Sequence, residues 1–471
     1  MAFPEGIKRA HVIGAGGIGV SAVAKLLRHH GATVTGSDLS RNEAVEELEQ
    51  AGIAVAKGHA AANLPADTEL VVYSDAVPVE NPERQAAAER SIRQLSYFDF
   101  LGEYSRGKHT LVVSGTNGKS TTTALLGLIL EKAGLDPTVI VGTKVPGWPD
   151  RNLRLGHSQY FVVEGCEYRA NMLKLAPRTI VLTNIEEDHL DYYRDLAHIR
   201  ETFQKFVGKL PADGTLILNA DDHISFHEIE PKSAFVTYGL DHPADYVGRV
   251  HAVGDGRQTF GITRTLGQEH LLGEFTMAVP GIFNVQNALA AAAAAFELGV
   301  TPETVRAALA EFRGVWRRFE KVGERHGAPI ISDYGHHPSA VKLTLAGARS
   351  FYPDRRLVLC FQPHQRNRTR KLFAEFVASF DGADFLVLPE IYDVAGREEA
   401  ADRDISSREL VKAVLARDSE HGRERPVIYS PDLTAARQEL ERLLLPNDVA
   451  LVMGAGDVYN ICRSLLSVGK A

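Results

Sequence analysis

The chain is poor in cysteine, in long apolar runs and in basic charge, and each shortage excludes a class of protein. Its three cysteines, Cys166, Cys360 and Cys462, lie far apart and form no CxxC pair, which argues against a disulfide framework and a structural zinc site. No stretch approaches the roughly 18 apolar residues of a membrane span, and the N-terminus lacks the apolar run of a signal peptide. We therefore expect a cytoplasmic protein.

The charge and length narrow the possibilities further. With 52 basic and 60 acidic residues the net charge is −8, so the chain is a poor candidate for binding nucleic acid or a membrane surface. Hydrophobic residues make up 44% and charged residues 24%, an ordinary globular composition. At about 150 residues per domain, 471 residues predict roughly three domains. This size favours an enzyme with clefts between domains over a single binding module.

Short apolar runs alternate with amphipathic stretches, a pattern typical of βαβ units and parallel sheets. The alternation restarts twice, which predicts domains over residues 1–106, 107–322 and 323–471. The predicted strands are Ala10–Ile13, Thr33–Gly36, Leu70–Ser74, Thr110–Val113, Tyr160–Val163, Thr179–Leu182, Thr215–Leu218, Pro329–Ile331, Arg356–Cys360, Phe385–Leu388 and Val449–Met453. The clearest predicted helices are Ser21–His30, Glu43–Ala51 and the alanine-rich residues 286–298.

A first glycine-rich turn, Gly14 to Gly19, follows a predicted strand and opens a helix. Its G-x-G-x-x-G spacing allows close backbone approach to a diphosphate at the helix N-terminus. Asp38 ends the next strand, where an acidic residue meets a ribose hydroxyl in dinucleotide-binding folds. The turn alone favours an NAD-dependent dehydrogenase, and a tight turn without a ligand is the structural alternative.

A second glycine-rich turn points to ATP. Strand residues up to Val113 lead into a loop and then a helix. The strict G-x-x-x-x-G-K-[ST] pattern fails because Val113 holds the first glycine position, yet the phosphate-binding core remains. Lys119 is suited to neutralise the β- and γ-phosphates, and the hydroxyl of Ser120 or Thr121 to bind Mg²⁺. The expected ATP-binding residues of this loop are Gly115, Thr116, Asn117, Gly118, Lys119, Ser120 and Thr121.

The shortened loop Gly115–Thr121 resembles that of the Mur ligase family, which makes the peptide stem of bacterial cell-wall precursors. Further segments resemble the family in order along nearly the whole chain: Val162–Glu164, Thr183–Asp191, Pro280–Ala288, Arg317–Glu320, Asp333–Pro338, Phe361–His364 and Gly454–Asp457. The resemblance implies an α/β fold of three domains. These are a Rossmann-like N-terminal domain that binds the UDP substrate, a central P-loop ATPase-like domain, and a Rossmann-like C-terminal domain that binds the amino acid.

The resemblance also implies an activity, which is ATP-dependent, Mg²⁺-requiring amide formation in peptidoglycan synthesis. ATP would phosphorylate a substrate carboxylate, and an amine would then displace phosphate from the acyl phosphate. Such chemistry relies on positioning and charge neutralisation. The segments at 333–338 and 361–364 resemble the branch that joins L-alanine to UDP-N-acetylmuramate, with domain closure and a monomer or weak homodimer expected.

For the metal site, the resemblance assigns Glu164 and His189, together with the Ser120 hydroxyl. Glu167 is a second candidate carboxylate. Without the resemblance, Glu164 reads as an exposed strand end, His189 as a packed or capping histidine, and residues 186–188 as charges that favour a helix start. The family's carbamylated lysine has no counterpart, because the comparable position holds Phe203.

The resemblance assigns the other ligands to residues in all three parts of the chain. Asn284, Arg318 and Asp333 would contact the adenosine or phosphates of ATP, although Arg317 and Arg318 alone read as a solvated basic pair. Asn287 is suited to a bond within its own helix start. The residues expected to hold UDP and its sugar are Gly16, Gly17, Ile18, Asp38, His59, Ser74 and Asn81.

The incoming amino acid would meet His336, His364 and Arg368, with arginine suited to a bidentate contact with its carboxylate. By spacing alone, His336, His337 and His364 also permit a zinc site. Two departures from the family stand out. Gln365 replaces the family's arginine, with Arg366 one place later, and Cys166 replaces an aspartate near the metal site. Because of Gln365, the sequence supports the prediction of L-alanine as the acceptor less firmly than the prediction of a ligase.

Two other functions stay open. A sister ligase would add another amino acid or a preformed peptide to the same sugar nucleotide. A regulatory nucleotide-binding protein would use the same turns without turnover.

Overall fold

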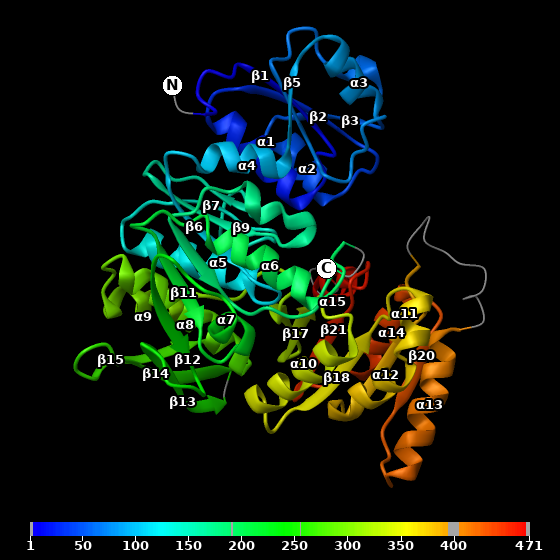
Figure 1. Cartoon of the computed structure of the whole chain (residues 1–471). Helices are drawn as coiled ribbons and strands as arrows, with labels where there is room; N and C mark the ends of the chain where they lie inside the picture. Colours follow the sequence, from blue (N-terminus) through cyan, green and yellow to red (C-terminus); the bar gives the residue numbers. More distant parts are fainter. Residues whose placement is uncertain (1–2, 190–191, 255, 394–404, 468–471) are drawn as a thin grey trace. The chain divides into compact units, whose positions relative to one another are not determined.

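The computed structural model describes all residues except 1–2, 190–191, 255, 394–404 and 468–471 (Figure 1). The last two residues of the Thr183–Asp191 motif therefore lie outside the described part. Two compact units make up the chain. Unit 1 comprises residues 1–249, 261–275 and 285–310, and unit 2 comprises residues 250–260, 276–284 and 311–471.

The first sheet, in unit 1, is parallel, in the order β3-β2-β1-β4-β5. Its strands are β1 Arg9–Ile13, β2 Thr33–Asp38, β3 Ala54–Lys57, β4 Leu70–Tyr73 and β5 Arg93–Ser96. Its helices are α1 Ile18–His29, α2 Glu43–Gln50, the short 3₁₀ turn Ala61–Asn63, α3 Pro82–Glu89 and α4 Tyr97–Ser105. The strand order reverses at β1, and open α/β sheets bind ligands at the carboxyl ends of strands at such a point. The first glycine turn follows β1.

The second sheet has the order β15-β14-β13-β12-β11-β10-β6-β9-β7-β8. Its strands are β6 His109–Ser114, β7 Thr138–Ile140, β8 Leu153–Arg154, β9 Tyr160–Gly165, β10 Thr179–Leu182, β11 Thr215–Asn219, β12 Ala234–Gly239, β13 Tyr246–Gly254, β14 Arg257–Arg264 and β15 His270–Met277. The accompanying helices are α5 Lys119–Lys132, the 3₁₀ segment Tyr168–Lys174, α6 Leu196–Val207, α7 His223–His227, α8 Ile282–Glu297 and α9 Pro302–Glu311. The order reverses again at β6, between β9 and β10, and the second glycine turn follows that strand.

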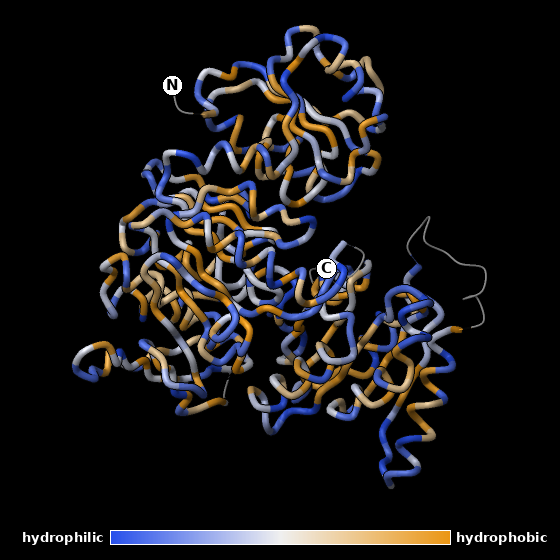
Figure 2. Tube along the Cα trace, viewed as in Figure 1, coloured by the Kyte–Doolittle hydropathy of each residue, from blue (hydrophilic) through white to orange (hydrophobic). Residues whose placement is uncertain are grey.

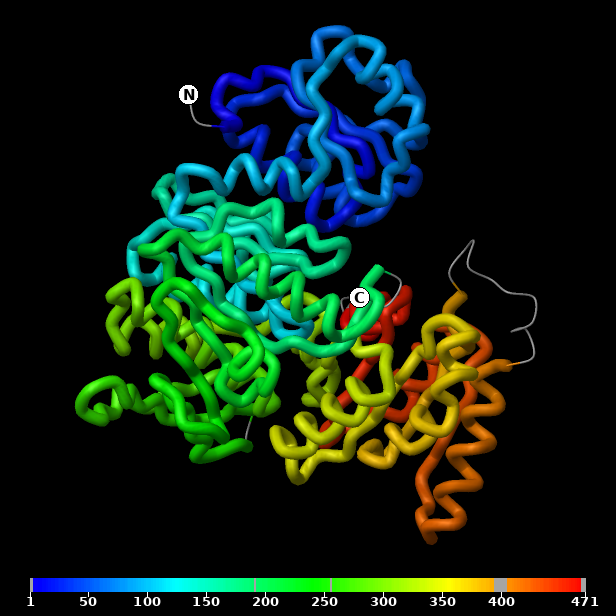
Figure 3. The backbone as a smooth tube through the Cα atoms, in the orientation of Figure 1, coloured from blue at the N-terminus to red at the C-terminus, as the bar shows by residue number. Residues whose placement is uncertain are grey.

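The third sheet, in unit 2, has the order β16-β17-β21-β18-β19-β20, parallel except for the β16–β17 pair. Its strands are β16 Glu320–Arg325, β17 Ala328–Asp333, β18 Arg356–Phe361, β19 Phe385–Pro389, β20 Val427–Ser430 and β21 Asp448–Met453. Its helices are α10 Pro338–Phe351, α11 Arg366–Lys371, α12 Phe373–Ser379, the 3₁₀ turn Phe380–Gly382, α13 Ser407–Glu420, α14 Leu433–Leu443 and α15 Tyr459–Ser467. In Figure 3 the red β21 returns to lie between the yellow strands of this sheet.

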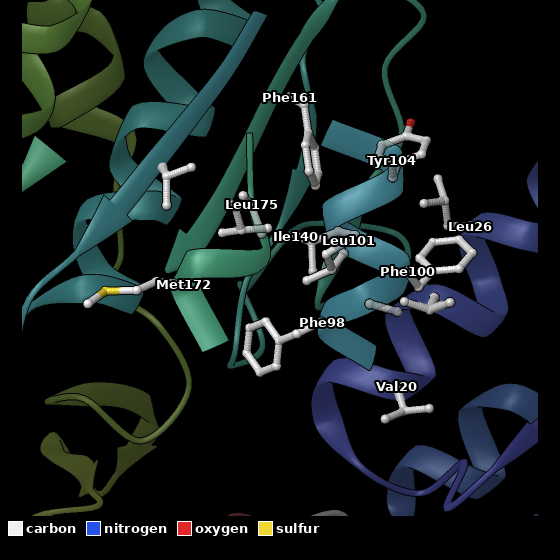
Figure 4. Packing of buried hydrophobic residues seen from close by; sticks show 14 of the residues in the cluster. Val20, Leu26, Phe98, Phe100, Leu101, Tyr104, Ile140, Phe161, Met172 and Leu175 are labelled. Carbon is white, nitrogen blue, oxygen red and sulfur yellow. The ribbon is translucent and has the colours of Figure 1, made fainter. Parts of the chain in front are cut away.

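The hydrophobic core follows the sheets. Figure 2 shows apolar residues concentrated in the strands and polar ones on the connecting loops. In unit 1 one buried cluster joins α1, α4 and the second sheet, and it includes Leu26 of α1, Phe98, Phe100 and Leu101 of α4 and Phe161 of β9 (Figure 4). Among the described residues, no helix is long and apolar enough to cross a membrane.

The predicted strands are all present, most extended by a residue or two, and the predicted alanine-rich helix is α8, with every alanine from 290 to 295 at 0% exposure. Ten strands in the described part of the chain were not predicted from the sequence: β3, β5, β7, β8, β12, β16, β20 and the strands β13, β14 and β15. In β13, for instance, Tyr246 and Gly248 are buried while Arg249 and residues 251–253 are exposed, so the strand lacks the continuous apolar run that marks a central parallel strand.

Candidate active site

The loop after β6 is shaped to wrap phosphate. Gly115 and Gly118 take positive φ angles of 136° and 84°, which only glycine adopts without steric cost. Gly118 directly precedes α5, so the unpaired N–H groups of the helix start face the loop. A Cβ on Gly118 would lie 2.3 Å from Oδ1 of Asn287. Asn287 of α8 thus packs against the loop as well as lying within its own helix.

The segment 183–186 braces this loop. The N–H of Thr116 donates to the Asn184 carbonyl at 2.9 Å, and the N–H of Asn117 donates to the Asn184 side-chain oxygen at 2.8 Å. Asn117 Nδ2 also donates to Glu186 at 3.1 Å. The helix start that charges 186–188 suggested is absent, and α6 begins only at Leu196. These residues serve as a wall for the phosphate loop.

Lys119 lies across the loop. Its Nζ donates to the carbonyls of Gly115 (2.5 Å) and Thr116 (2.9 Å) and lies 2.9 Å from a carboxylate oxygen of Glu167. The Glu167 side chain is only 5% exposed. An ammonium held at the mouth of a glycine loop is the arrangement that neutralises nucleotide phosphates. Glu167 fixes where that ammonium lies.

Two groups of ligand atoms lie beside Lys119. The Ser120 hydroxyl donates to Glu164 Oε2 at 3.1 Å, and the other Glu164 oxygen accepts the N–H of Gly142 at 2.6 Å. Separately, single ligand atoms of Glu167, Asp188 and His189 lie within 4.8 Å of one another. The structure thus brings Ser120 to Glu164 and places His189 with Glu167. Hard carboxylate and hydroxyl oxygens are ligands that suit Mg²⁺.

His189 takes a strained conformation, with a φ of 54°. Its ring lies 4.9 Å from that of Tyr168, and its Nε2 lies 3.7 Å from Glu167 Oε1. Left-handed backbone at a non-glycine residue persists only where the surroundings impose it. Its side chain is 35% exposed, and the next helix, α6, is capped by Asp195, so the histidine is neither a helix cap nor a packed core residue.

The first glycine turn has the predicted form. Gly14 has a φ of 75°, and the Asp38 carboxylate accepts the N–H of Gly16 at 2.8 Å. A Cβ on Gly19 would lie 2.6 Å from Cζ of Tyr97, so this glycine lets α1 approach α4. Ser74, just after β4, lies beside Gly14 in the same way, 3.0 Å from the position of its Cβ.

Beneath this turn lies a buried polar network that the sequence analysis missed. Glu83 has a fully buried side chain and accepts from Ser37 (2.5 Å), Asn63 (2.6 Å), the N–H of Ala60 (3.1 Å) and His11 (3.3 Å). Burial opposes ionisation, but these donors, led by His11, outweigh it and lower the pKa of Glu83 to about 2. The network therefore holds a buried carboxylate anion.

Two predicted UDP-site residues belong to that network. His59 Nδ1 lies 3.0 Å from the Ser37 hydroxyl, which itself donates to Glu83. Asn81 is 5% exposed, and its side-chain oxygen accepts the N–H groups of Glu83 and Arg84, capping α3. An asparagine followed by proline at a helix start is a capping signal. The Asn81 oxygen thus has two backbone partners at the start of α3.

In unit 2, three residues predicted to contact ATP have protein partners. Asn284 is buried, and its Nδ2 donates to the Pro280 carbonyl at 2.7 Å. Asp333 is buried, accepts the N–H groups of Gly335 and Phe319, and has a pKa raised chiefly by burial. Arg318 is exposed, with its guanidinium 5.6 Å from the Tyr334 ring.

The interpretation of residues 317–318 as a solvated pair is wrong for Arg317. Its guanidinium is buried, donates to the carbonyls of Gly454 and Gly456, and lies 4.9 Å from the Tyr334 ring. Burial lowers its pKa. The backbone at Arg317 has a φ of 56°, which turns the side chain inward to the loop after β21. Neighbouring arginines in one dipeptide thus have opposite environments.

The three residues predicted to meet the amino acid come together in unit 2. The His336 and His364 rings are 5.9 Å apart, and Arg368 lies 3.4 Å from His364 Nδ1. His364 also stacks on Tyr392, with ring centroids 5.4 Å apart. Because arginine only donates, His364 Nδ1 accepts and its proton lies on Nε2. His364 and Arg368 therefore both present donors.

His336 has the opposite character. Burial, and then the charge of Arg368, lower its pKa to about 4. Its Nδ1 lies 3.2 Å from the Tyr334 carbonyl, which can only accept, so Nδ1 carries the proton and Nε2 presents a lone pair. A donor pair beside a neutral acceptor matches the carboxylate and amino ends of an amino acid.

The neighbouring positions resolve two sequence questions. The His337 side chain accepts from the N–H of Ser339 and caps α10, whereas His336 bonds the Tyr334 carbonyl. The two side chains therefore have different partners, which argues against a zinc ion shared between them. Arg366 lies 2.8 Å from Asp393 and 3.3 Å from Glu390. It is neutralised by these carboxylates and does not substitute for the arginine replaced by Gln365.

Tyr97 and Gly142 also lie at the site, although no sequence motif marked them. Burial, and then the charge of Glu164, raise the pKa of Tyr97, and Gly142 donates directly to that carboxylate. Tyr97 opens α4 and Gly142 follows β7, so both are far from Glu164 in sequence. The pairing of β7 with β9 brings Gly142 to Glu164, and the packing of α4 against the second sheet brings Tyr97 there.

Comparison with known proteins agrees with this geometry. Three family models match in succession: Mur ligase family, catalytic domain, over residues 9–109; Mur ligase middle domain, over 113–295; and Mur ligase, glutamate ligase domain, over 317–456. The UDP-N-acetylmuramate–L-alanine ligase of Salinibacter ruber is 40% identical over 464 residues, covering 98% of this chain and 95% of that protein. The ligase of the same name from Geobacter sp. (strain M21) is 38% identical, covering 99% and 98%.

Solved structures extend the comparison to the fold. The UDP-N-acetylmuramate–alanine ligase of Thermotoga maritima matches with a TM-score of 0.80 at 26% identity, and the murein peptide ligase of Psychrobacter arcticus with a TM-score of 0.68 at the same identity. Each match covers 98% of both chains. The three-domain α/β architecture predicted from the motifs is thereby confirmed. Since the similarity runs through all three sheets and both glycine turns, the chain belongs to the Mur ligase family.

Proposed function

We propose that the chain joins L-alanine to UDP-N-acetylmuramate at the expense of ATP, in the synthesis of peptidoglycan precursors. The observation that carries this proposal is the near-identical length and 38–40% identity shared with relatives named for that reaction. The family is one of ATP-dependent amide ligases, which replaces the dehydrogenase and regulatory hypotheses. The better structural match to the alanine ligase than to the murein peptide ligase favours the single amino acid.

The reaction proceeds in two displacements. A carboxylate oxygen of the muramoyl substrate attacks the γ-phosphorus and expels ADP, and the alanine amine then attacks the acyl carbon and expels inorganic phosphate. The loop Gly115–Thr121 wraps the phosphates with backbone N–H groups, and Lys119 neutralises their charge. Glu167, which now holds Lys119 at 2.9 Å, orients that ammonium. Preorganised charge of this kind supplies most of the rate in phosphoryl transfer.

The ligand groups beside Lys119 fit Mg²⁺. Ser120 and Glu164 would hold one ion, and His189 another, with Glu167 as a further carboxylate. The support is the chemistry of the donors and their closeness, 3.1 Å between Ser120 and Glu164 and 4.8 Å across the Glu167 group. Bound Mg²⁺ would neutralise the charge that gathers as a carboxylate meets a triphosphate.

The second unit supplies the acceptor site in this proposal. His364 and Arg368 bind the alanine carboxylate through their N–H donors. Neutral His336 accepts a hydrogen bond from the alanine amino group at Nε2, which orients the amine toward the acyl carbon. Asn284, Arg318 and Asp333 are assigned to the adenosine end of ATP on the family resemblance.

The first glycine turn holds the diphosphate of the UDP substrate in this proposal. Gly16, Gly17 and Ile18 offer the helix N-terminus. Asp38, His59 and Ser74 lie around the turn and are assigned to uridine or the sugar. A cytoplasmic location and a monomer or weak homodimer remain predictions from the sequence.

The test is phosphate release by the purified chain with ATP, Mg²⁺ and UDP-N-acetylmuramate, run across L-alanine, glycine, L-serine and a stem tripeptide, with product masses recorded. We expect release that requires both the sugar nucleotide and L-alanine, and a product heavier by one alanine residue. A product carrying the tripeptide would assign the chain to the sister ligase. No release with any acceptor would refute the ligase proposal.

A further inference from the structure

The segment of residues 141–152, here called the strap, connects the surroundings of the two glycine turns. It leaves β7 and returns in β8. Its ends pair through the N–H of Val141 and the carbonyl of Asn152 at 3.1 Å, and Val145 pairs with Arg151 at 2.9 Å. Trp148 is 9% exposed and lies 3.5 Å from where a Cβ on Gly127 of α5 would stand. The strap is therefore a closed loop fastened to the helix that begins at the phosphate loop.

One end of the strap sets the position of Glu164. The N–H of Gly142 donates to Glu164 Oε1 at 2.6 Å, while Ser120 of the phosphate loop donates to the other oxygen. A Cβ on Gly142 would lie 3.0 Å from that second oxygen. The strap backbone thus contacts the carboxylate directly, with no side chain between them.

The other end holds the first turn of α1. Asn152 Nδ2 donates to the carbonyl of Ile18 and to the Ser21 hydroxyl at 2.9 Å. Lys25 Nζ donates to Asn152 Oδ1 at 3.1 Å and to the carbonyl of Asp150 at 2.9 Å. Ser21 and Lys25 are four residues apart and so share one face of α1. Ile18 lies within the first glycine turn and is the first residue of α1.

A second anchor joins the strap to α2. Lys144 Nζ lies 3.0 Å from Glu43 and 2.8 Å from Glu47, and Lys25 lies 3.5 Å from the same Glu47. The side chains of Lys25 and Lys144 are 4% and 5% exposed. Burying charged pairs rarely stabilises a fold more than apolar packing would, whereas it does impose one geometry. Two buried lysines, Lys25 of α1 and Lys144 of the strap, meet at Glu47 and therefore point to a requirement for position.

We propose that the strap is a positioning element, which sets the distance between the start of α1 and Glu164 so that one substrate molecule reaches both. The proposal rests on the proposed function, in which the diphosphate binds at α1 and the carboxylate of the same molecule reacts beside Glu164. The two binding points must then match the length of the substrate. Lys25, Lys144 and Asn152 are positioning residues, since they act through α1 and Glu164.

The test separates binding from reaction. Lys25→Met and Lys144→Met remove the buried charges and keep the side-chain length, and Glu47→Gln is a milder change to the partner that both lysines share. We expect calorimetric Kd values for the UDP substrate and for ATP to stay within about threefold of the parent, while kcat falls about 10- to 100-fold, because a misplacement near 1 Å costs about that much. Lys144→Met combined with Glu47→Gln should be little worse than Lys144→Met alone, since the two residues share one interaction.

Arg425→Met is the matched control. It removes a buried ion pair, to Asp418 at 2.7 Å, from unit 2 and leaves the strap intact. Its kcat should stay near that of the parent, even where its loss of thermal stability equals that of Lys25→Met or Lys144→Met. If the strap variants keep the parent kcat, or lose it only as Arg425→Met does, the positioning role is wrong.

Hydrogen exchange gives a readout that does not depend on activity. Amides at residues 18–21 and at Gly142 should lose protection together in Lys25→Met and Lys144→Met. Unchanged exchange at both places would overturn the proposal even in an inactive protein. Failure of the parent chain to release phosphate would count against the proposed function alone.

Discussion

Replacing Glu83 by glutamine should destabilise the first sheet, although the two side chains have nearly the same volume. The Glu83 carboxylate is fully buried, and Ser37, Asn63, His11 and the N–H of Ala60 all point hydrogen-bond donors at it. A glutamine amide carries one oxygen and an NH₂ group, so at least one of these donors would face another donor. The change removes a buried anion while its partners stay in place.

The magnitude follows from the ionisation of the carboxyl. Its pKa falls from 4.5 in an unstructured chain to about 2 in the fold, which corresponds to about 3 kcal/mol of folding free energy at neutral pH. Removing one partner of a buried ionic network costs about 3–5 kcal/mol. This contribution is complete above pH 4.5 and is lost as the pH falls toward 2, because the unfolded chain takes up the proton first.

The assay is calorimetric unfolding of the full chain at pH 7.5 and at successively lower pH. In domains of 150–250 residues each kcal/mol moves the midpoint by about 2–4 °C, so we expect Glu83→Gln to lower the first transition by roughly 6–12 °C. Glu201→Gln is the control, because its pair with Lys205 is exposed (56% and 60%) and exposed ion pairs contribute little to stability.

Two results would refute this reasoning. The first is a Glu83→Gln midpoint within the range of Glu201→Gln at pH 7.5. The second is a difference between parent and Glu83→Gln that stays constant, or grows, as the pH falls below about 4.5.

Three further predictions concern the site. Lys119→Ala should abolish phosphate release while the Kd for the UDP substrate, by calorimetry, stays near the parent value, and retained turnover would contradict the role of the phosphate loop. Gly118→Ala should weaken ATP binding at least about tenfold in the same titration, since its Cβ would stand 2.3 Å from Asn287 Oδ1 at a φ of 84° and such backbone strain costs about 1–3 kcal/mol; unaltered binding would show that the loop adapts. Burial lowers the pKa of His336 to about 4, so this side chain should stay neutral between about pH 5.5 and 7.5. The pH dependence of kcat/KM for L-alanine in this range should therefore have the same shape in the parent and in His336→Gln. A fall in kcat/KM toward pH 5.5 that is present in the parent and absent in the variant would mean that His336 changes its charge in this range.

Much of the local structure could be predicted because local rules govern it. Buried parallel strands such as β6 and β10 read as continuous apolar runs, and the glycine turns after β1 and β6 have fixed spacing. The weak predictions concern residues whose environment depends on distant segments. Arg317 and Arg318 are adjacent and chemically identical, yet only the first is buried, because the loop after β21 offers it carbonyl partners.

The candidate site shows the same division. Lys119, Ser120 and Glu164 could be named from their motifs, since each motif carries its own chemistry. The grouping of His189 with Glu167, in place of Glu164, depends on how segments 166–168 and 188–189 pack. Asn81 was assigned to a ligand, whereas its oxygen caps α3, a role that its place before Pro82 already indicated.

What the sequence determined by itself is therefore the chemistry that is encoded in short segments: the α/β alternation, two phosphate-binding turns and the family. Those features need only neighbouring residues, because turn geometry and helix N-termini are local. The tertiary structure alone decided which donors face which acceptors. Through the tertiary structure His336 is a neutral acceptor beside two donors, and Arg366 forms ion pairs with Asp393 and Glu390. The same structure also buries Glu83 as an anion and places the N–H of Gly142 against the Glu164 carboxylate. Each of these depends on burial and on partners distant in the chain, and both arise only when the sheets assemble.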